Sequence, residues 1–221
     1  MILVDRQIRE LCKQGMVSPY DPTLLNSHSI DVRIGHTAMV EGLDGNLNNI
    51  RLDEHFSREN PYFVCPNQFF LSHTFELVDI PPNIAAEFRL KSTRAREGWT
   101  HALAVWIDGG FNGSITLELG NARQYKSLPI YTGMKIGQLI FHETETPDVS
   151  YAEVGRYNGY TVVQPAKPDD AEELSPFDLP DDEGGDLEGT PPLTLADQIE
   201  QDINRYGEIY DGWNQDENSG D

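Results

Sequence analysis

Residues 84–119 read IAAEFRLKSTRAREGWTHALAVWIDGGFNGSITLEL, and their pattern decides the fold class. The turn Asp108–Gly110 interrupts this stretch, and three short runs in it are apolar or alternate between apolar and polar residues: Ile84–Leu90, Leu103–Ile107 and Ser114–Leu119. Short runs that are bounded by Gly and Asp turns are typical of β-strands. The stretch therefore predicts a sheet of short strands.

The same pattern extends to both sides of this stretch. Turn signals such as Pro81–Pro82–Asn83 and Tyr131–Thr132–Gly133 separate further short runs, which are Ser29–Ile34, Tyr62–Val64, Phe69–Leu71, Phe75–Val78, Leu128–Ile130 and Lys135–His142. Many short strands at regular spacing, with few helices, indicate a β-barrel or a β-sandwich. We therefore expect an all-β domain.

One helix is expected near the amino terminus, over Asp5–Gly15. Ile8, Leu11 and Cys12 recur there at helical spacing. Asp5 is predicted as the N-cap of this helix, and Gly15 as the glycine that ends it. After Gly15 the helical period disappears, so the helix is short and stands before the strands.

The charge divides the chain into two regions. The 221 residues carry 37 acidic and 16 basic side chains, a net charge of −21. Residues 168–221 contain 18 of the acidic side chains and a single basic one, Arg205, which leaves a net charge of −4 for residues 1–167. We expect one globular domain over residues 1–167 and an acidic tail over residues 168–221.

The tail itself has two parts. Pro168–Pro192 is rich in Asp, Glu, Pro and Gly and poor in apolar residues, a composition typical of a disordered linker. Residues 194–210 place apolar side chains at spacings of three and four, which predicts a short amphipathic helix. That helix would dock on its own domain, on a neighbouring subunit or on another protein; alternatively, the whole tail is solvated.

Composition also excludes several classes of protein. No basic stretch could neutralise a nucleic-acid backbone, and no apolar run is long enough to span a membrane. The first ten residues, MILVDRQIRE, carry charges where a signal peptide has its apolar core, so we expect a cytoplasmic protein. Cys12 and Cys65 suggest thiols in a reducing compartment.

Several catalytic templates are missing from the sequence. A zinc deaminase needs His-x-Glu together with Pro-Cys-x-x-Cys, and neither motif occurs. A Gly-rich phosphate loop followed by Lys-Ser/Thr is also missing, as is a Gly-x-Ser-x-Gly elbow. Any catalytic site must therefore use another set of residues.

The candidate residues lie between residues 91 and 118. Lys91–Arg96 brings together three cations and two hydroxyl groups directly after a predicted strand, which suits a polyphosphate, although a solvated polar turn has the same composition. Asp108 is displayed by a tight turn. Glu118 lies in a strand among apolar residues, where a carboxylate is costly unless it is paired or acts as an acid or a base. It is equally compatible with the outward face of an alternating strand.

These segments resemble the dCTP deaminase branch of the trimeric dUTPase superfamily. The resemblance covers residues 1–167 and rests on the order and spacing of four segments, which are SIDVRIG at 29–35, KSTRAREG at 91–98, IDGGFNGSITLE at 107–118 and RYNGY at 156–160. It implies a distorted β-barrel of the dUTPase-like β-clip type, assembled as a homotrimer with active sites at the subunit interfaces. It also implies deamination of dCTP to dUTP and ammonia without zinc, with Mg²⁺ bound only to the triphosphate, in a bacterial or phage-infected cell.

The resemblance assigns a role to each matching position. Glu118 would be the general base that activates water, and Ser92 and Arg96 would contact the phosphates and help to hold that water. Asp108 would bind the deoxyribose 3′-hydroxyl. The remaining substrate contacts would be Lys91 and Thr93 beside the phosphates, Ala102, Leu103 and Ala104 at the pyrimidine edge, and Arg156, Tyr157 and Tyr160 in a lid over the phosphates.

The sequence departs from the family pattern in a few places. Lys91 stands where Arg is usual, Arg94 replaces an apolar residue, and Tyr160 replaces Gln. The segment between Gly98 and Asp108 looks more like the bifunctional deaminase–diphosphatases, so the product would be dUMP if pyrophosphate is also cleaved.

Two further alternatives remain open; Glu118 argues against the first, and the intact set Ser92, Arg96, Asp108 and Glu118 argues against the second. One is a plain dUTP diphosphatase, in which the position of Glu118 is usually apolar. The other is a non-catalytic binding module that acts through its acidic tail. The sequence does not decide whether dTTP inhibits the reaction. By resemblance, His101 is the candidate residue that would sense dTTP.

Overall fold

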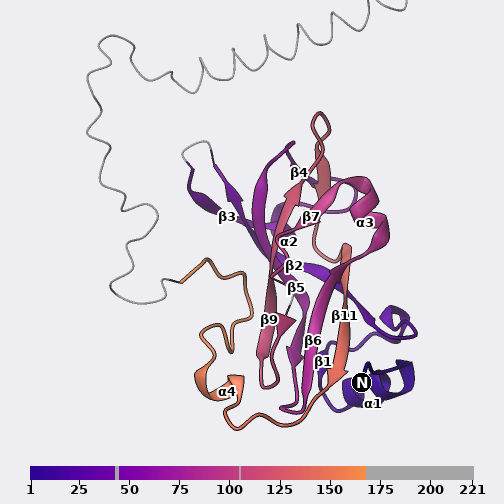
Figure 1. Ribbon diagram of the computed structural model, residues 1–221. Coiled ribbons are helices and arrows are strands. Elements are labelled where there is room, and N and C mark those ends of the chain that lie inside the picture. Colours follow the sequence, from indigo (N-terminus) through magenta and orange to yellow (C-terminus); the bar gives the residue numbers. More distant parts are fainter. Residues whose placement is uncertain (43–44, 105, 168–221) are drawn as a thin grey trace, which may run out of the picture. The chain divides into compact units, whose positions relative to one another are not determined.

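The structure is a computed structural model that describes residues 1–42, 45–104 and 106–167 (Figure 1). Residues 1–166 form one compact unit. Within the described residues, no helix combines the length and the apolar character that a membrane crossing requires. The predicted acidic linker and the predicted helix at 194–210 lie outside the described residues and stay predictions.

Most of the compact unit is β-structure. The strands in chain order are β1 (Val17–Ser18), β2 (Ile30–Glu41), β3 (Leu47–Arg51), β4 (Tyr62–Val64), β5 (Phe69–Asp79), β6 (Ile84–Leu90), β7 (Trp99–His101), β8 (Trp106–Ile107), β9 (Asn112–Asn121), β10 (Leu128–Ile130) and β11 (Lys135–Glu143). The helical segments are short: α1 (Asp5–Lys13), η1 (Pro22–Leu24), α2 (Leu52–His55), α3 (Ser92–Glu97) and α4 (Tyr151–Val154).

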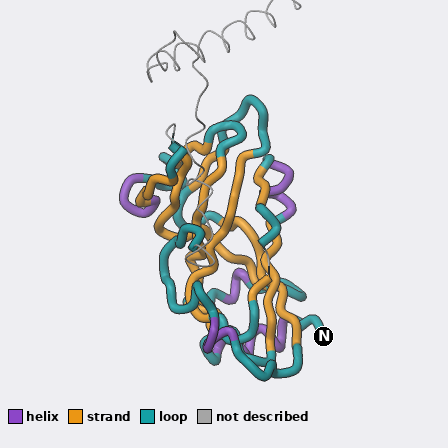
Figure 2. The backbone as a smooth tube through the Cα atoms, turned by 60° about the vertical axis from the view of Figure 1, so that its left-hand side comes forward, coloured by secondary structure: helices purple, strands orange, loops and turns teal. Residues whose placement is uncertain are grey.

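The strands form one large sheet that curls into half a barrel (Figure 2). Its order is β7-β9-β5-β2-β11-β6-β8, with β1 paired to β5 and β3 paired to β2, and the small β4–β10 pair stands apart from it. All of these pairs are antiparallel. The predicted all-β fold class is confirmed.

The core lies where alternate residues of the long strands face inward. Fully buried side chains come from β5, β6, β9 and β11, among them Phe70, Phe88, Leu117, Leu119 and Phe141. Because side chains alternate across a strand, the opposite face of β9 is left free for polar residues. This alternation positions the functional site described below.

A buried histidine sets the bend in β2 and β5. The pairing of these strands changes register between Ile34 and Ala38, where the Nε2 of His73 accepts hydrogen bonds from the backbone N–H groups of His36 and Thr37 (3.1 and 3.3 Å). A Cβ on Gly35 would lie 2.3 Å from the His73 ring, so only glycine fits there. The glycine that closes SIDVRIG is therefore required by packing.

The amino-terminal helix departs from its predicted cap. Val4, not Asp5, is the N-cap of α1, and the Gln7 side chain accepts a hydrogen bond from the Val4 N–H (3.1 Å). Asp5 is the first helical residue, where a carboxylate stabilises the positive end of the helix dipole. The predicted stop is confirmed, since Gly15 has φ +105 directly after the C-cap residue Gln14.

Several predicted strand boundaries are wrong, and β2 continues to Glu41 where the expected strand ended at Ile34. Phe69–Leu71 and Phe75–Val78 belong to one continuous strand, β5, because its change of register at His73 keeps the chain extended. In the run Leu103–Ile107, Trp106 and Ile107 form β8, whereas Leu103 adopts a left-handed backbone conformation with φ +68 and is not extended. The polar segment after Leu90 forms the helix α3, which Gly98 ends with φ +111.

Candidate active site

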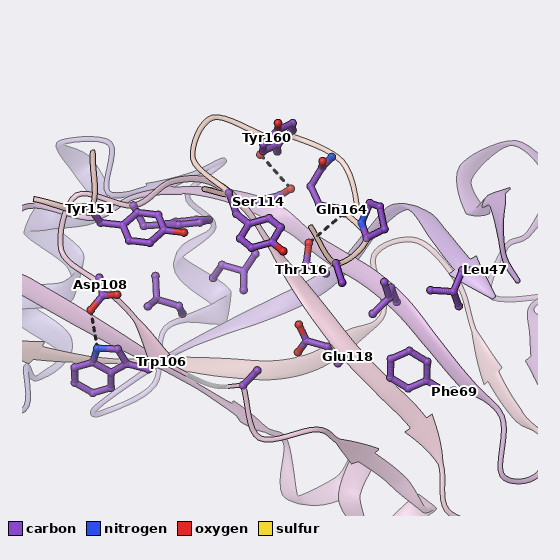
Figure 3. Close-up of a pocket in the computed structure, with 18 residues that line it drawn as sticks. Leu47, Phe69, Trp106, Asp108, Ser114, Thr116, Glu118, Tyr151, Tyr160 and Gln164 are labelled. Carbon is purple, nitrogen blue, oxygen red and sulfur yellow. Dashed lines mark hydrogen bonds between the residues drawn. The ribbon is translucent and has the colours of Figure 1, made fainter. Parts of the chain in front are cut away.

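A cleft of about 420 Å³ lies over the outer face of β9 (Figure 3). One wall comes from the outward side chains of β9, while β8 contributes Trp106 and the turn after β8 contributes Asp108. The segment after α4 closes another side with Tyr157, Tyr160, Gln164, Pro165 and Ala166. The lining is mainly apolar and aromatic, with a few polar groups, which is typical of a small-molecule site.

The alternation of β9 delivers the acidic group of the cleft. Ser114, Thr116 and Glu118 lie two residues apart on the cleft side, while Leu117 and Leu119 are fully buried on the core side. Figure 3 shows the Glu118 carboxylate pointing into the cleft, between Trp106 and Phe69. The Glu118 side chain is 28% exposed, so it lies neither in the core nor in bulk solvent.

Glu118 faces a buried histidine. The Nε2 atom of His101 lies 3.3 Å from Oε2 of Glu118, and the His101 side chain is only 5% exposed. The contact lacks the alignment of a hydrogen bond, and both atoms are buried without a hydrogen-bond partner among the described residues. Buried polar atoms are rarely left unsatisfied, so this pair marks the place where a water molecule or a substrate group is expected.

The backbone fixes which nitrogen of His101 carries the proton. The N–H of Leu103 donates to Nδ1 of His101 at 3.3 Å, which makes Nδ1 the acceptor. A neutral imidazole then carries its proton on Nε2, the nitrogen that faces Glu118. The left-handed conformation of Leu103 is unfavourable for a leucine, and it aims this N–H at the ring.

A second carboxylate is held at the other end of the cleft. Asp108 lies in the turn after β8, and its Oδ1 accepts a hydrogen bond from the indole N–H of Trp106 at 2.9 Å. Gly109 makes this turn possible, because a Cβ there would lie 2.5 Å from the carbonyl oxygen of Pro82. The bond to Trp106 leaves the second oxygen of Asp108 to accept from a ligand hydroxyl.

The chain after α4 runs along β9 and covers the cleft. The N–H of Gly159 donates to the carbonyl of Asn112, and the N–H of Ser114 donates to the carbonyl of Tyr160, both at 2.7 Å. Gly113 permits this approach, because a Cβ on it would lie 2.4 Å from the Tyr160 carbonyl oxygen. The predicted lid residues Tyr157 and Tyr160 therefore line the cleft, whereas Arg156 is exposed outside it.

The predicted phosphate-binding residues lie elsewhere on the protomer. Ser92, Thr93 and Arg96 are exposed on α3 and do not line the cleft, and Lys91 is bound to Asp31. None of the described residues that line the cleft is a lysine or an arginine. Within the described part of one chain, the two carboxylates of the cleft therefore lie apart from the cations that a polyphosphate needs.

The predicted pyrimidine-reading residues are only partly together. Ala104 lines the cleft, whereas Ala102 donates its N–H to the Glu118 carbonyl at 3.0 Å and Leu103 is 75% exposed. The sequence analysis assigned no role in catalysis to His101 or to Trp106. His101 meets Glu118 across the β7–β9 pair, and Trp106 bonds to Asp108 at the end of β8. Neither pair belongs to a sequence motif.

Comparison with known proteins identifies the family. Residues 2–144 match the family described as dCTP deaminase-like. The dCTP deaminase, dUMP-forming, of Methanoregula boonei is 35% identical over 171 residues, which cover 68% of this chain and 87% of that protein. The chain belongs to the dCTP deaminase-like family. The predicted membership is confirmed.

Other relatives of this dCTP deaminase-like protein carry the same name. The dCTP deaminase, dUMP-forming, of Aquifex aeolicus is 36% identical over 182 residues, which cover 79% of this chain and 98% of the relative. The crystal structure of 2′-deoxycytidine 5′-triphosphate deaminase from Agrobacterium tumefaciens matches with a TM-score of 0.53 and 19% identity, over 64% of this chain and 47% of that chain. At that identity the match supports the fold alone.

Proposed function

We propose that this protein converts dCTP to dUMP, releasing ammonia and pyrophosphate. The deaminase half rests on the family and on Glu118, whose buried oxygen has no hydrogen-bond partner among the described residues and faces the cleft. The pyrophosphate half rests on the relatives, which are named as dUMP-forming enzymes. The bifunctional alternative is therefore preferred here over the expected release of dUTP.

The chemistry of deamination follows from the position of Glu118. Its carboxylate takes a proton from a water molecule while the water oxygen attacks C4 of the cytosine ring. The same carboxylate then returns the proton to the amino group, the C4–N bond breaks, and ammonia leaves with the ring as uracil. The proton on Nε2 of His101 faces the carboxylate and helps to orient it for this transfer.

The second half of the reaction consumes another water molecule. Water adds to the phosphorus at the α position, the bond to the β-phosphate oxygen breaks, and pyrophosphate leaves. Asp108 would hold the 3′-hydroxyl of the deoxyribose with the oxygen that Trp106 leaves free. This fixes the sugar between the ring at Glu118 and the phosphates.

The phosphates require a second copy of the chain. The cleft itself contributes Asp108 and Glu118 but no cation from the described residues, so it would repel a triphosphate. Ser92 and Arg96 are exposed on α3, where a neighbouring protomer can reach them. We propose a homotrimer in which α3 of one protomer completes the cleft of the next, with Tyr157 and Tyr160 covering the phosphates.

We further propose that Mg²⁺ enters with the triphosphate. Mg²⁺ prefers oxygen ligands, keeps several waters and is often held through substrate phosphates. The described residues contain no group of three His, Cys, Asp or Glu side chains arranged to hold a metal, so phosphate oxygens would be its main ligands. When bound, it neutralises phosphate charge, and Ser92 and Arg96 bind the remaining oxygens.

The test is to incubate the full chain with dCTP and, separately, with dUTP, and to measure ammonia, pyrophosphate and dUMP. We expect equal amounts of ammonia and pyrophosphate from dCTP. Ammonia with accumulating dUTP would refute the bifunctional reaction and leave a simple deaminase. Pyrophosphate from dUTP with no ammonia from dCTP would refute deamination.

A further inference from the structure

A buried carboxylate beside α3 is shared by two lysines. Asp31 lies on β2, and its side chain is 5% exposed. Its Oδ1 lies 2.6 Å from Nζ of Lys91 and accepts from the Asn26 amide at 2.8 Å, and its Oδ2 lies 3.4 Å from Nζ of Lys135. Within this cluster one negative charge faces two ammonium groups, which leaves one positive charge in excess; the carboxylate of Asp21 also interacts electrostatically with Lys135 and Arg33.

The excess charge belongs mainly to Lys135. Lys91 makes the shorter contact and its side chain is 29% exposed, whereas the Lys135 side chain is 43% exposed. An ammonium group has three donors, and the contact with Asp31 uses at most one of those on Lys135. Lys135 therefore keeps donors that can reach a ligand in solvent, while Asp31 holds the side chain in place.

Neighbouring cations do not show this excess. Arg33 on β2 pairs with the buried Glu76, whose Oε1 lies 2.6 Å from the Arg33 Nε and whose Oε2 accepts the Arg33 backbone N–H at 2.8 Å. Arg94 pairs with Glu97 at 2.5 Å. Each of these two cations has a carboxylate of its own, whereas Lys135 shares Asp31 with Lys91.

The cluster adjoins the helix that carries the proposed phosphate ligands. Lys91 directly precedes Ser92, and its N–H donates to the Ile136 carbonyl at 3.0 Å. Nε of Arg94 donates to the Lys135 carbonyl at 2.9 Å. The start of β11 and the start of α3 are thus joined, and Lys135 flanks the helix that presents Ser92 and Arg96.

We propose that Lys135 is a phosphate-binding residue of the active site, held by Asp31 beside α3. The inference rests on the proposed function, because the ligand it assigns to Lys135 is the triphosphate of the nucleotide substrate. Lys91, by contrast, serves chiefly to neutralise Asp31 and to anchor the start of α3. The site would then gain its cationic character from Arg96 and Lys135.

The test compares Lys135→Gln, Lys135→Arg and, as a matched control, Lys13→Gln. Lys13 lies in α1 and pairs with Glu10 at 2.9 Å, so its variant also removes one charge and one ion pair. The KM for dCTP is measured with kcat, together with inhibition by inorganic tripolyphosphate and by deoxycytidine, which has no phosphate. Thermal unfolding of each variant is recorded alongside.

Lys135→Gln should raise the KM for dCTP and the inhibition constant of tripolyphosphate by about tenfold, the effect of one charge-assisted hydrogen bond. Inhibition by deoxycytidine should stay as in the unsubstituted protein, and Lys135→Arg should restore most of the lost affinity. If Lys135→Gln matches Lys13→Gln in both constants and only unfolds more easily, Lys135 is structural and the proposal is wrong. If neither dCTP nor dUTP is turned over, that result refutes the proposed function alone. Calorimetric binding of tripolyphosphate to the Lys135 variants still tests the role of Lys135.

Discussion

Replacing Glu118 with glutamine removes the proposed general base while leaving its surroundings intact. The amide has nearly the same shape as the carboxylate but cannot take a proton from water. General-base catalysis contributes about 100- to 10,000-fold to a rate, so kcat for ammonia release from dCTP should fall by that factor. The KM should change much less, because Glu118 acts on the attacking water.

The structure also limits the effect of this change on stability. Oε2 of Glu118 has no hydrogen-bond partner among the described residues, and the imidazole of His101 lies 3.3 Å from it. The substitution should therefore change the free energy of unfolding by no more than about 1 kcal/mol. For a domain of this size that corresponds to a shift in Tm of at most about 4 °C.

The assay follows ammonia release at saturating dCTP and dCTP binding by calorimetry. Glu41→Gln is the matched control, because Glu41 is exposed at the end of β2 and lies outside the cleft. It should retain full activity. If Glu118→Gln keeps more than about a tenth of kcat, the carboxylate is not the base, since even the weakest general base contributes more than that. Loss of binding together with activity would instead make Glu118 a substrate ligand.

Three further predictions concern other parts of the domain. Trp106→Phe keeps an aromatic side chain but removes the hydrogen bond to Asp108. The KM for dCTP should therefore rise about three- to tenfold with little change in Tm. An unchanged KM would show that Asp108 binds the substrate without this hydrogen bond. Gly113→Ala places a Cβ against the Tyr160 carbonyl, which should loosen the segment after α4 from β9. Proteolysis of that segment should then be faster and the KM for dCTP should rise. An unchanged rate of cleavage would contradict the contact. Burial lowers the pKa of His73 to about 4 from its usual 6.5. Below pH 6.5 the unfolded chain therefore binds more protons than the folded one. The free energy of unfolding should fall by up to about 3 kcal/mol as the pH drops to 4. Denaturant titrations from pH 7 to 4 measure that loss, and the same slope in His73→Gln would assign it to other groups.

The local features of the fold were predictable from residue patterns. Alternation gave the strands Tyr62–Val64, Ile84–Leu90 and Leu128–Ile130 with their observed bounds, and Gly15 ends the first helix as expected. These features depend on neighbours within a few residues, where side-chain period and turn preference act directly. The same alternation placed Glu118 on the face of β9 opposite the core.

The boundaries that failed depend on contacts that side-chain alternation does not encode. His73 lies opposite Gly35 and accepts bonds from the backbone of β2, which bends β5 without breaking it. Leu103 leaves the strand because its N–H bonds to the ring of His101. Side-chain alternation cannot report either effect. His73 bonds to a strand that is far from it in the sequence, and Leu103 adopts an unusual backbone conformation.

The sequence by itself determined which residue types were available: a carboxylate on an alternating strand, a carboxylate in a tight turn and a cationic segment rich in hydroxyl groups. It also determined the family that they resemble. Only the tertiary structure decided their partners. It brings His101 to Glu118 across the β7–β9 pair, Asp31 to Lys91 and Lys135 across β2, β11 and β6, and Tyr160 to the edge of β9. The reason is that side-chain period fixes which face a residue occupies, whereas strand order, register and bulges fix which residue it meets there.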